Sequence, residues 1–407
     1  MLHNIFICFL YIFINFAESN INAMAGLYVH IPICRHKCLY CDFYSCGEKA
    51  VDADALIACI CEEMRRRRKE LYDDRNLFQD FSRPLFDTVY IGGGTPSLLT
   101  ENQLRKLLRE IYAIFNIKEG AEVTIEVNPD DVTADLCAVL KECGVNRIIA
   151  GIQSLVDKEL LAVGRRHNAD TARRAMGLLS EHFDNCSFDL IFGLPGQTFQ
   201  SWKYSVDEVM AYRPKHISCY SLMYEEGTAL TLLRDQGRIK ESNEILSEKM
   251  FGYIQRAAAD HNYIQYEISN YAQPGFESRH NSSYWCGAPY LGIGPGAHSY
   301  DGDRKRRANT PDSRKYIKHF SSVEDKPFYE EEILSDAELK EEYLLTRLRM
   351  RKGFSREDYV AHFGGIDDIA PRLNRLLSEG LLIEEGGYIK IAPEHIMMSD
   401  AIIVELF

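Results

Sequence analysis

The chain has 407 residues, of which 46% are hydrophobic and 26% charged, a composition typical of a soluble globular protein with one large domain and one small one. Its formal net charge of −13 argues against a nucleic-acid partner held by general electrostatics. The basic run 65–69 is a local exception. Because Glu62, Glu63 and Glu70 surround this run on a predicted helix, it indicates a solvated helix face.

The first 23 residues differ from the rest of the chain. Residues 5–16 are strongly apolar, but this stretch is too short to cross a bilayer as a helix. No Lys or Arg precedes it, as a signal peptide would normally require. Since Met24 opens a run typical of the start of a cytosolic enzyme, we expect an over-extended start site, with a weak membrane anchor as the alternative. We therefore expect a cytoplasmic protein without stable membrane insertion.

From Leu27 onward, short β-branched runs alternate with amphipathic helical stretches. We predict strands over residues 27–31, 88–91, 122–127, 147–152, 187–192 and 216–222. Between them we predict helices near residues 53–71, 101–115, 134–143, 169–182 and 198–212. Strands separated by such helices form right-handed βαβ units around a parallel sheet. Six units are too few for a closed eight-stranded barrel, so the predicted fold class is α/β, with a partial (β/α)6 barrel.

After residue 260 the regular alternation fades. A glycine- and aromatic-rich stretch over 280–300 leads to a predicted charged linker over 301–326. Helical patterns near 338–351, 355–362 and 366–379 and a hairpin over 381–391 then indicate a small winged-helix-like domain. Because this domain has no clear excess of basic residues, we expect a packing or protein-interaction role. The predicted divisions of the chain are 1–23, 24–260, 261–330 and 331–407.

Three of the twelve cysteines lie within eight residues, at Cys34, Cys38 and Cys41. Thiolates are the standard ligands of iron–sulfur clusters, and this close spacing lets one loop cover one face of a 4Fe–4S cube. Three ligands leave the fourth iron without a protein ligand, which is an open site for cofactor chemistry, as at a catalytic zinc. The sequence therefore predicts a 4Fe–4S cluster held by three thiolates.

Other ligands and another metal fit this loop less well. A zinc site would normally pair two C-x-x-C units or add histidines at a set spacing, and the sequence has no second pair. His30, His36 and Cys46 are not spaced as a fourth ligand. Most of the remaining cysteines stand singly in apolar stretches, which is typical of small buried residues in a reducing cytoplasm.

The three-cysteine spacing resembles the signature of the radical S-adenosylmethionine (SAM) superfamily. The runs from Tyr28 to Cys34 and from Gly92 to Pro96 resemble the family of oxygen-independent coproporphyrinogen oxidases, and the likeness extends from Met24 to the C-terminus. The oxidase branch of that family has a fourth cysteine two residues after the third, and a longer N-terminal arm. This chain has Phe43 in place of that cysteine and lacks the arm. It is more similar to the heme chaperone branch, which has C-D-F here and an H-N-x-x-Y-W motif, present at residues 280–285.

The resemblance implies a SAM pocket at the carboxyl ends of the predicted strands, where polar or glycine-rich residues recur. In that pocket the run from Gly92 to Pro96, which we call the glycine loop, would approach the methionyl amino group because glycine has no Cβ. The implied residues are Glu126 for the ammonium or the ribose, Arg165 for the methionyl carboxylate, Gln153 and Asp189 for the ribose, and Tyr28, Gly94 and Thr95 to complete the pocket. A surface carboxylate, a turn cap and a solvent-facing arginine are the alternatives for Glu126, Asp189 and Arg165.

The resemblance implies two functions from different classes. In the first, the protein is a heme chaperone that passes heme to acceptor hemoproteins such as respiratory enzymes, with the cluster and SAM supporting or regulating the transfer. His280 is then the candidate heme ligand, and Tyr284 and Trp285 are candidates to stack on the macrocycle. Alternatively, His280, Asn281 and Trp285 only brace the turn over 292–299. We predict no catalytic residue for this function.

In the second function, the protein decarboxylates coproporphyrinogen III by radical chemistry that the cofactor supplies. Phe43 and the missing arm favour the chaperone. The sequence is compatible with a monomer and with a homodimer.

Overall fold

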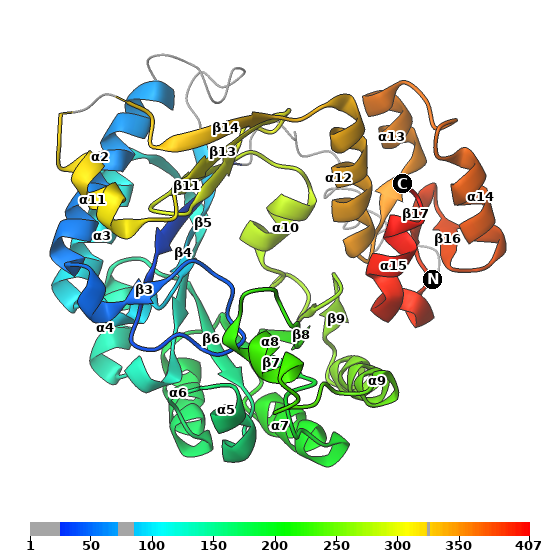
Figure 1. The fold of residues 1–407 in the computed structure, drawn as a ribbon, viewed down its shortest axis with the longest axis horizontal. Coiled ribbons are helices and arrows are strands. Elements are labelled where there is room, and N and C mark those ends of the chain that lie inside the picture. Colours follow the sequence, from blue (N-terminus) through cyan, green and yellow to red (C-terminus); the bar gives the residue numbers. More distant parts are fainter. Residues whose placement is uncertain (1–24, 72–84, 324–325) are drawn as a thin grey trace, which may run out of the picture.

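The computed structural model describes residues 25–71, 85–323 and 326–407 (Figure 1). The predictions of an over-extended start and of a weak anchor in the first 23 residues lie outside these residues. In the part of the chain that is described, no helix combines the length and the apolar character needed to cross a membrane.

A twelve-stranded, mostly parallel sheet forms the larger body, and helices cover its outer face (Figure 1). All six predicted strands are present in it, as β1 (Ala25–Ile31), β4 (Leu85–Gly93), β5 (Asn116–Val127), β6 (Arg147–Gln153), β7 (Cys186–Phe192) and β8 (His216–Ser221). They follow one another in this order and run parallel. Their apolar side chains are buried on both faces, as helix-covered parallel strands require. The predicted α/β fold class is confirmed.

The predicted helices are also present and differ from the prediction by at most two residues at each end. They are α2 (Ala53–Lys69), α3 (Glu101–Ile114), α4 (Ala134–Glu142), α6 (Ala169–His182) and α7 (Phe199–Ala211). Thr100 and Thr198 close capping boxes at the starts of α3 and α7, which is a signal that can be read locally. Three further helices follow the later strands, the short α5 (Asp157–Ala162) and α8 (Ala229–Asp235) and the longer α9 (Glu244–Asp260).

One residue of the basic run on α2 contradicts the predicted solvated face. Arg67 is only 3% exposed, and its guanidinium donates to Glu70 at 3.0 Å and to the hydroxyl of Ser299 at 3.3 Å. The Arg67 side chain therefore points into the protein, because the strand that carries Ser299 packs on this side of α2.

The region after residue 260 extends the main sheet rather than leaving it. It contains β9 (Ile264–Gln265), β10 (Asn270–Ala272), α10 (Arg279–Trp285), β11 (Tyr290–Ile293), β12 (His298–Tyr300), β13 (Lys305–Asn309), α11 (Ser313–Phe320) and β14 (Tyr329–Ile333). Strand β11 pairs in parallel with β1, so it is a seventh parallel strand. Strands β12, β13 and β14 then continue the sheet in antiparallel order.

The predicted charged linker over 301–326 is therefore wrong. Strand β13 and helix α11 occupy this segment, and α11 packs against α2. The charges misled the prediction because they are paired inside the structure. Arg307 on β13 is 6% exposed and donates to Glu70 and to Glu331, each at 3.0 Å.

The last part of the chain has the predicted winged-helix order and its own hydrophobic core, which includes Leu344, Tyr359 and Leu373. Its elements are α12 (Asp336–Arg349), β15 (Phe354–Ser355), α13 (Arg356–Phe363), α14 (Ala370–Ser378), β16 (Leu382–Glu385), β17 (Tyr388–Ile391) and α15 (Ser399–Val404). Strand β15 adds a third strand to the hairpin, and α15 packs against α12; neither was predicted. Helix α12 lies next to α10 and faces the main sheet (Figure 1).

Candidate functional site

The cysteine loop leaves the short strand β2 (Ile33–Cys34) at the carboxyl edge of the sheet and contacts two of the predicted SAM residues. The thiol of Cys34 lies 3.5 Å from the hydroxyl of Thr95. The guanidinium of Arg165 donates to the sulfur of Cys38 at 3.5 Å. The backbone NH of Cys41 donates to the carbonyl of Cys38 at 3.2 Å, which closes a turn within the loop. The loop is thus attached on one side to the glycine loop and on the other to Arg165.

The donor set of this loop consists of three thiols. Cys34, Cys38 and Cys41 are half-buried and free. Burial raises the pKa of Cys41 to about 11, and the neighbouring Cys38 and Cys34 act in the same direction. Among the described residues, no three Cys, His, Asp or Glu side chains converge as the ligands of a single metal ion. Soft sulfur donors spread along one loop fit an iron–sulfur cluster, which is larger than one ion.

The glycine loop lies tightly against the strand that leads to Cys34. A Cβ on Gly94 would lie 2.7 Å from the carbonyl oxygen of Ile33, and one on Gly93, whose φ is +109°, would lie 2.5 Å from the ring of His30. The NH of Gly94 also donates to the carbonyl of Ile31 at 2.8 Å. These glycines therefore have a packing reason of their own, in addition to the ligand access that the sequence suggests.

Two predicted carboxyl groups are half-buried at the same edge of the sheet. Glu126, near the end of β5, accepts hydrogen bonds from the hydroxyl of Tyr90 at 2.5 Å and from the NH of Gly93 at 3.2 Å. Burial raises the pKa of Glu126 to about 7, with a further contribution from Asp189, and burial raises the pKa of Asp189 to about 6. Neither group is a surface carboxylate or a helix cap. The groups that shift Glu126 include no cation, so a positively charged ligand would stabilise its carboxylate.

Gln153 and Arg165 present unused polar atoms beside these carboxyls. Gln153 ends β6 with a φ of 65°, in the left-handed region, and its Oε1 is buried without a hydrogen-bond partner in the described part of the chain. Arg165 donates to the carbonyl of Gly151 at 2.6 Å, while its Nε is also buried and unpartnered within the described residues. Backbone strain and unsatisfied buried polar atoms are typical of ligand sites. This arrangement fits a ligand that carries hydroxyl and carboxylate groups.

His280 lies outside this pocket, on α10, and is 1% exposed. Its Nδ1 is 2.7 Å from the hydroxyl of Thr88 and its Nε2 is 2.8 Å from that of Tyr284. Burial lowers the pKa of His280 to about 3, so the ring is neutral. These contacts brace α10 against β4, and not against the turn over 292–299 that the alternative interpretation names. A bond from His280 to heme iron would require one of the two hydrogen bonds to break, and this role stays a prediction.

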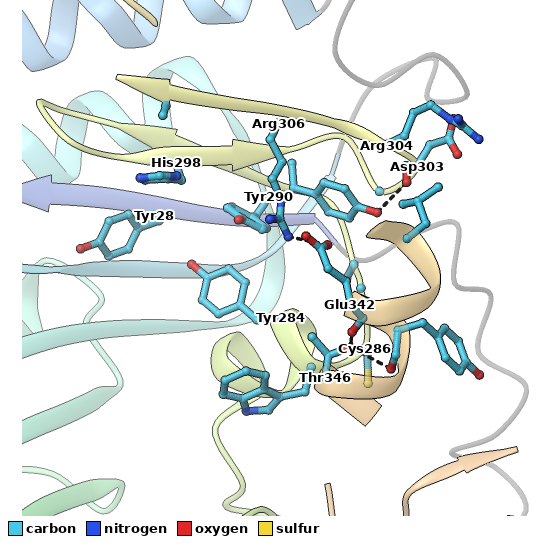
Figure 2. A pocket seen from close by; sticks show the side chains of 18 of the residues that line it. Tyr28, Tyr284, Cys286, Tyr290, His298, Asp303, Arg304, Arg306, Glu342 and Thr346 are labelled. Atoms are coloured by element: carbon cyan, nitrogen blue, oxygen red, sulfur yellow. Dashed lines mark hydrogen bonds and ion pairs between the residues drawn. The ribbon is translucent and has the colours of Figure 1, made fainter. Parts of the chain in front are cut away.

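A large cleft, which the sequence interpretation missed, lies between strands β11–β13 and helix α12 (Figure 2). Its volume is about 1130 Å³, and we call it the α12 cleft. Aromatic side chains form much of its lining, among them Tyr28, Tyr284, Trp285, Tyr290, Tyr300 and Tyr343. Arg306 and Glu342 pair across it at 2.7 Å. Tyr290 is the half-buried residue of β11 and the other three are buried, so no local alternation indicated this wall.

The α12 cleft adjoins the cysteine loop. Asp42, Phe43 and Tyr44, which directly follow Cys41, line it, and Phe43 is 63% exposed. Tyr28, predicted for the SAM pocket, also faces the cleft, and its hydroxyl lies 2.9 Å from Nδ1 of His30. Phe43 therefore presents an apolar ring to the cleft at the position where the oxidase branch has a cysteine.

Comparison with known proteins agrees with this geometry. Residues 28–209 match the Radical SAM superfamily. The solved structure of coproporphyrinogen III oxidase (HemN) from Escherichia coli superposes with a TM-score of 0.78 over 94% of this chain and 90% of that chain, at 19% identity. This likeness shows a shared fold. The fold and the cysteine loop thus define a radical SAM protein.

The sequence relatives identify the family within that class. The chain is 33% identical over 366 residues to the heme chaperone HemW of Bacillus subtilis, covering 88% of this chain and 93% of that protein. It is 32% identical over 396 residues to the heme chaperone HemW of Escherichia coli, covering 94% and 97%. Radical S-adenosyl methionine domain-containing protein 1, mitochondrial, of Mus musculus is 32% identical over 283 residues, which are 69% of this chain and 62% of that protein. The chain belongs to the HemW family of radical SAM proteins.

Proposed function

We propose that this protein is a heme chaperone that binds heme and transfers it to hemoproteins, and that it carries a 4Fe–4S cluster with exchangeable SAM. The observation that carries this proposal is the α12 cleft, about 1130 Å³ in volume and walled by aromatic side chains, beside the cysteine loop. Its volume is slightly above the usual range for ligand pockets, which suits a macrocycle, and aromatic rings offer stacking surfaces for a porphyrin. The relatives named heme chaperones support the same function.

The cofactors would lie at the carboxyl edge of the sheet. Cys34, Cys38 and Cys41 would hold the cluster, and SAM would contact Tyr28, Gly94, Thr95, Glu126, Gln153, Arg165 and Asp189. When bound, the cluster and SAM supply one-electron chemistry at this edge. The half-buried Glu126 carboxyl would balance the ligand's positive charge, and Arg165, which already contacts Cys38, would orient its carboxylate.

The rim of the α12 cleft offers basic groups for the heme propionates. Arg304 pairs with Asp336 at 3.1 Å, and both side chains are well exposed, at 42% and 84%. Because exposed ion pairs contribute little free energy, a propionate could replace Asp336 as the partner of Arg304 with little loss of stability. Such exchange suits a cargo that must be released to an acceptor.

We place this function in the cytoplasm, with acceptor hemoproteins as partners and respiratory enzymes among them. The eleven cysteines of the described residues are all free, which suits a reducing compartment. A monomer suffices for the proposed sites, and a homodimer is equally compatible with them.

The test is a pair of anaerobic assays on the cluster-reconstituted full chain. Heme-loaded protein should transfer heme to an apo-hemoprotein, measured as recovered activity of that acceptor. The same preparation with coproporphyrinogen III, SAM and a reductant should yield no vinyl product. Formation of protoporphyrinogen without heme transfer would contradict the chaperone and support the oxidase.

A further inference from the structure

The sheet wall of the α12 cleft presents one exposed imidazole. Along β12, Ser299 is buried toward α2, so the neighbouring residues His298 and Tyr300 face the opposite side, which is the cleft. His298 is exposed, and Figure 2 shows its ring beside Tyr28. Its partner in the β12–β13 register is the small Ala308, which leaves room above the imidazole. A ligand in the cleft can therefore reach this ring directly.

The backbone that carries His298 is held tightly. Gly292 on β11 has no room for a side chain, since a Cβ there would lie 1.9 Å from the carbonyl oxygen of His298. The NH of Gly292 donates to the hydroxyl of Ser299 at 2.9 Å, and the NH of Asn309 donates to the carbonyl of Ala297 at 2.9 Å. Functional groups on such rigid strands are positioned more precisely than those on loops.

The three imidazoles that line the cleft differ in availability. Both nitrogens of His30 are engaged, Nδ1 with Tyr28 at 2.9 Å and Nε2 with the carbonyl of Tyr44 at 3.0 Å. His362 lies on α13, in the winged-helix domain, and its Nδ1 is bonded to the carbonyl of Asp358 at 2.8 Å. The ring of His298 makes no hydrogen bond with any of the described residues. It is thus the free imidazole on the wall nearest the cysteine loop.

We propose that His298 ligates the iron of the heme that occupies the α12 cleft, an inference that rests on the proposed chaperone function. His280 then supports the site from behind, because its Nε2 holds the hydroxyl of Tyr284, a cleft-lining ring, at 2.8 Å. In Figure 2, Arg304 and Asp303 lie at the opposite end of the cleft from His298. The heme is therefore oriented with its iron near His298 and its propionates toward Arg304 and Arg306.

The test is a hemin titration of the full chain and its variants, followed by the Soret band and by electron paramagnetic resonance of the ferric form. In His298→Ala, the apparent Kd for hemin should rise about tenfold or more, which corresponds to about 1.4 kcal/mol, and the Soret band should shift. Added free imidazole should refill the space and restore the wild-type spectra. His362→Ala, the matched change of an exposed imidazole in the same cleft, should keep the wild-type spectra.

Two further variants separate ligation from support. His280→Ala should weaken binding through Tyr284 while leaving the Soret position unchanged, and Cys286→Ser should leave both unchanged. If His298→Ala proves unstable on heating, His298→Met replaces it. In this variant the thioether would replace the imidazole as iron ligand, so the Soret band and the electron paramagnetic resonance spectrum should both differ from those of the wild type. Wild-type spectra in the His298 variants, or a spectral change in His280→Ala, His362→Ala or Cys286→Ser instead, would overturn the assignment. Failure of the wild-type chain to bind hemin would instead reject the chaperone function itself.

Discussion

Two neighbouring regions hold their polar groups in opposite ways. One is the α12 cleft, and the other is the carboxyl edge of the main sheet with Glu126, Gln153 and Arg165, which we call the cofactor edge. At the cofactor edge, the Glu126 carboxyl is half-buried, and Oε1 of Gln153 and Nε of Arg165 are buried without a partner among the described residues. In the cleft, Arg306 pairs with Glu342 at 2.7 Å and Arg304 with Asp336 at 3.1 Å, near the surface. Buried polar groups without a partner destabilise the folded protein until a ligand bonds to them, whereas exposed groups that are already paired do not destabilise it. The first region is therefore suited to a small charged cofactor, and the second to a large, exchangeable, mostly apolar cargo.

The two regions share one wall, through which they are connected. A Cβ on Gly296, in the turn before His298, would lie 3.3 Å from the ring of Tyr44, which follows the cysteine loop. His30 links the same elements, since its ring lies against Gly93 of the glycine loop and bonds to the Tyr44 carbonyl. A change at the cluster therefore has a short structural route to the cleft, and the predictions below test how far the two regions are separable.

The largest effect is expected from removal of the cluster ligands. Cys34→Ala, Cys38→Ala or Cys41→Ala should abolish the cluster, because no other thiolate replaces a missing ligand at this spacing. Iron and acid-labile sulfide content after reconstitution measure this. Cys46→Ala, a neighbouring cysteine that lies 3.6 Å from the Ser313 hydroxyl, is the control and should retain the cluster. Hemin binding that survives without the cluster would show that the cleft is independent, and full cluster content in a ligand variant would refute the assignment.

The next effect concerns the shared wall. Gly292→Ala should destabilise the protein by about 3 kcal/mol, since the added Cβ would lie 1.9 Å from the His298 carbonyl oxygen and must displace β12. Urea denaturation measures the free energy of unfolding. Gly365→Ala, where a Cβ would have no neighbour within 4 Å, should change it by about 0.5 kcal/mol or less. Equal stability of the two variants would mean that β11 and β12 are more loosely joined than the structure indicates.

A third effect separates the regions by pH. The pKa of Glu126 is raised from 4.5 to about 7, so its contribution to stability is present below pH 4.5 and is lost as the pH rises through about 7. Glu126→Gln has no such loss and should be more stable than wild type at pH 8 by about 1–3 kcal/mol, but not at pH 4.5. Asp189, Tyr90 and the other facing groups remain in both proteins, so the difference between them isolates Glu126. Urea denaturation at both pH values measures this, and an equal difference in the free energy of unfolding between the two proteins at pH 4.5 and pH 8 would contradict it. The affinity for SAM should also be lower in the variant than in the wild type at pH 8.

The smallest effect is expected from the strained residue at the end of β6. Gln153→Gly should raise the free energy of unfolding by about 1 kcal/mol or less, because glycine adopts a φ of 65° without strain. The same change should weaken SAM binding, measured by calorimetry on the reconstituted protein. Asn262→Gly, at a φ of 63° after α9, is the control and should leave SAM affinity unchanged. Unchanged SAM affinity in Gln153→Gly would remove that side chain from the proposed pocket.

Local patterns in the sequence carried much of this architecture. The short β-branched runs of the strands and the capping residues of α3 and α7 are local signals, so the six strands, the five helices and the winged-helix order could be predicted. The cysteine spacing is equally local, and the parallel topology then places Thr95, Glu126, Gln153 and Arg165 at one edge. The charged segment over 301–326 misled because its partners, such as Glu70, are remote in the chain.

The sequence by itself thus determined the α/β class, the cysteine loop and the residues at the cofactor edge, since each depends on short spacings or on the order of strands. Only the tertiary structure decided that β11 returns to pair with β1, that α12 faces β11–β13 to form the cleft, and that His280 is bonded to Thr88 while His298 stays open. Thr88 and His280 are 192 residues apart. A hydrogen bond over that separation depends on how the whole fold places α10 against β4, which no local spacing encodes.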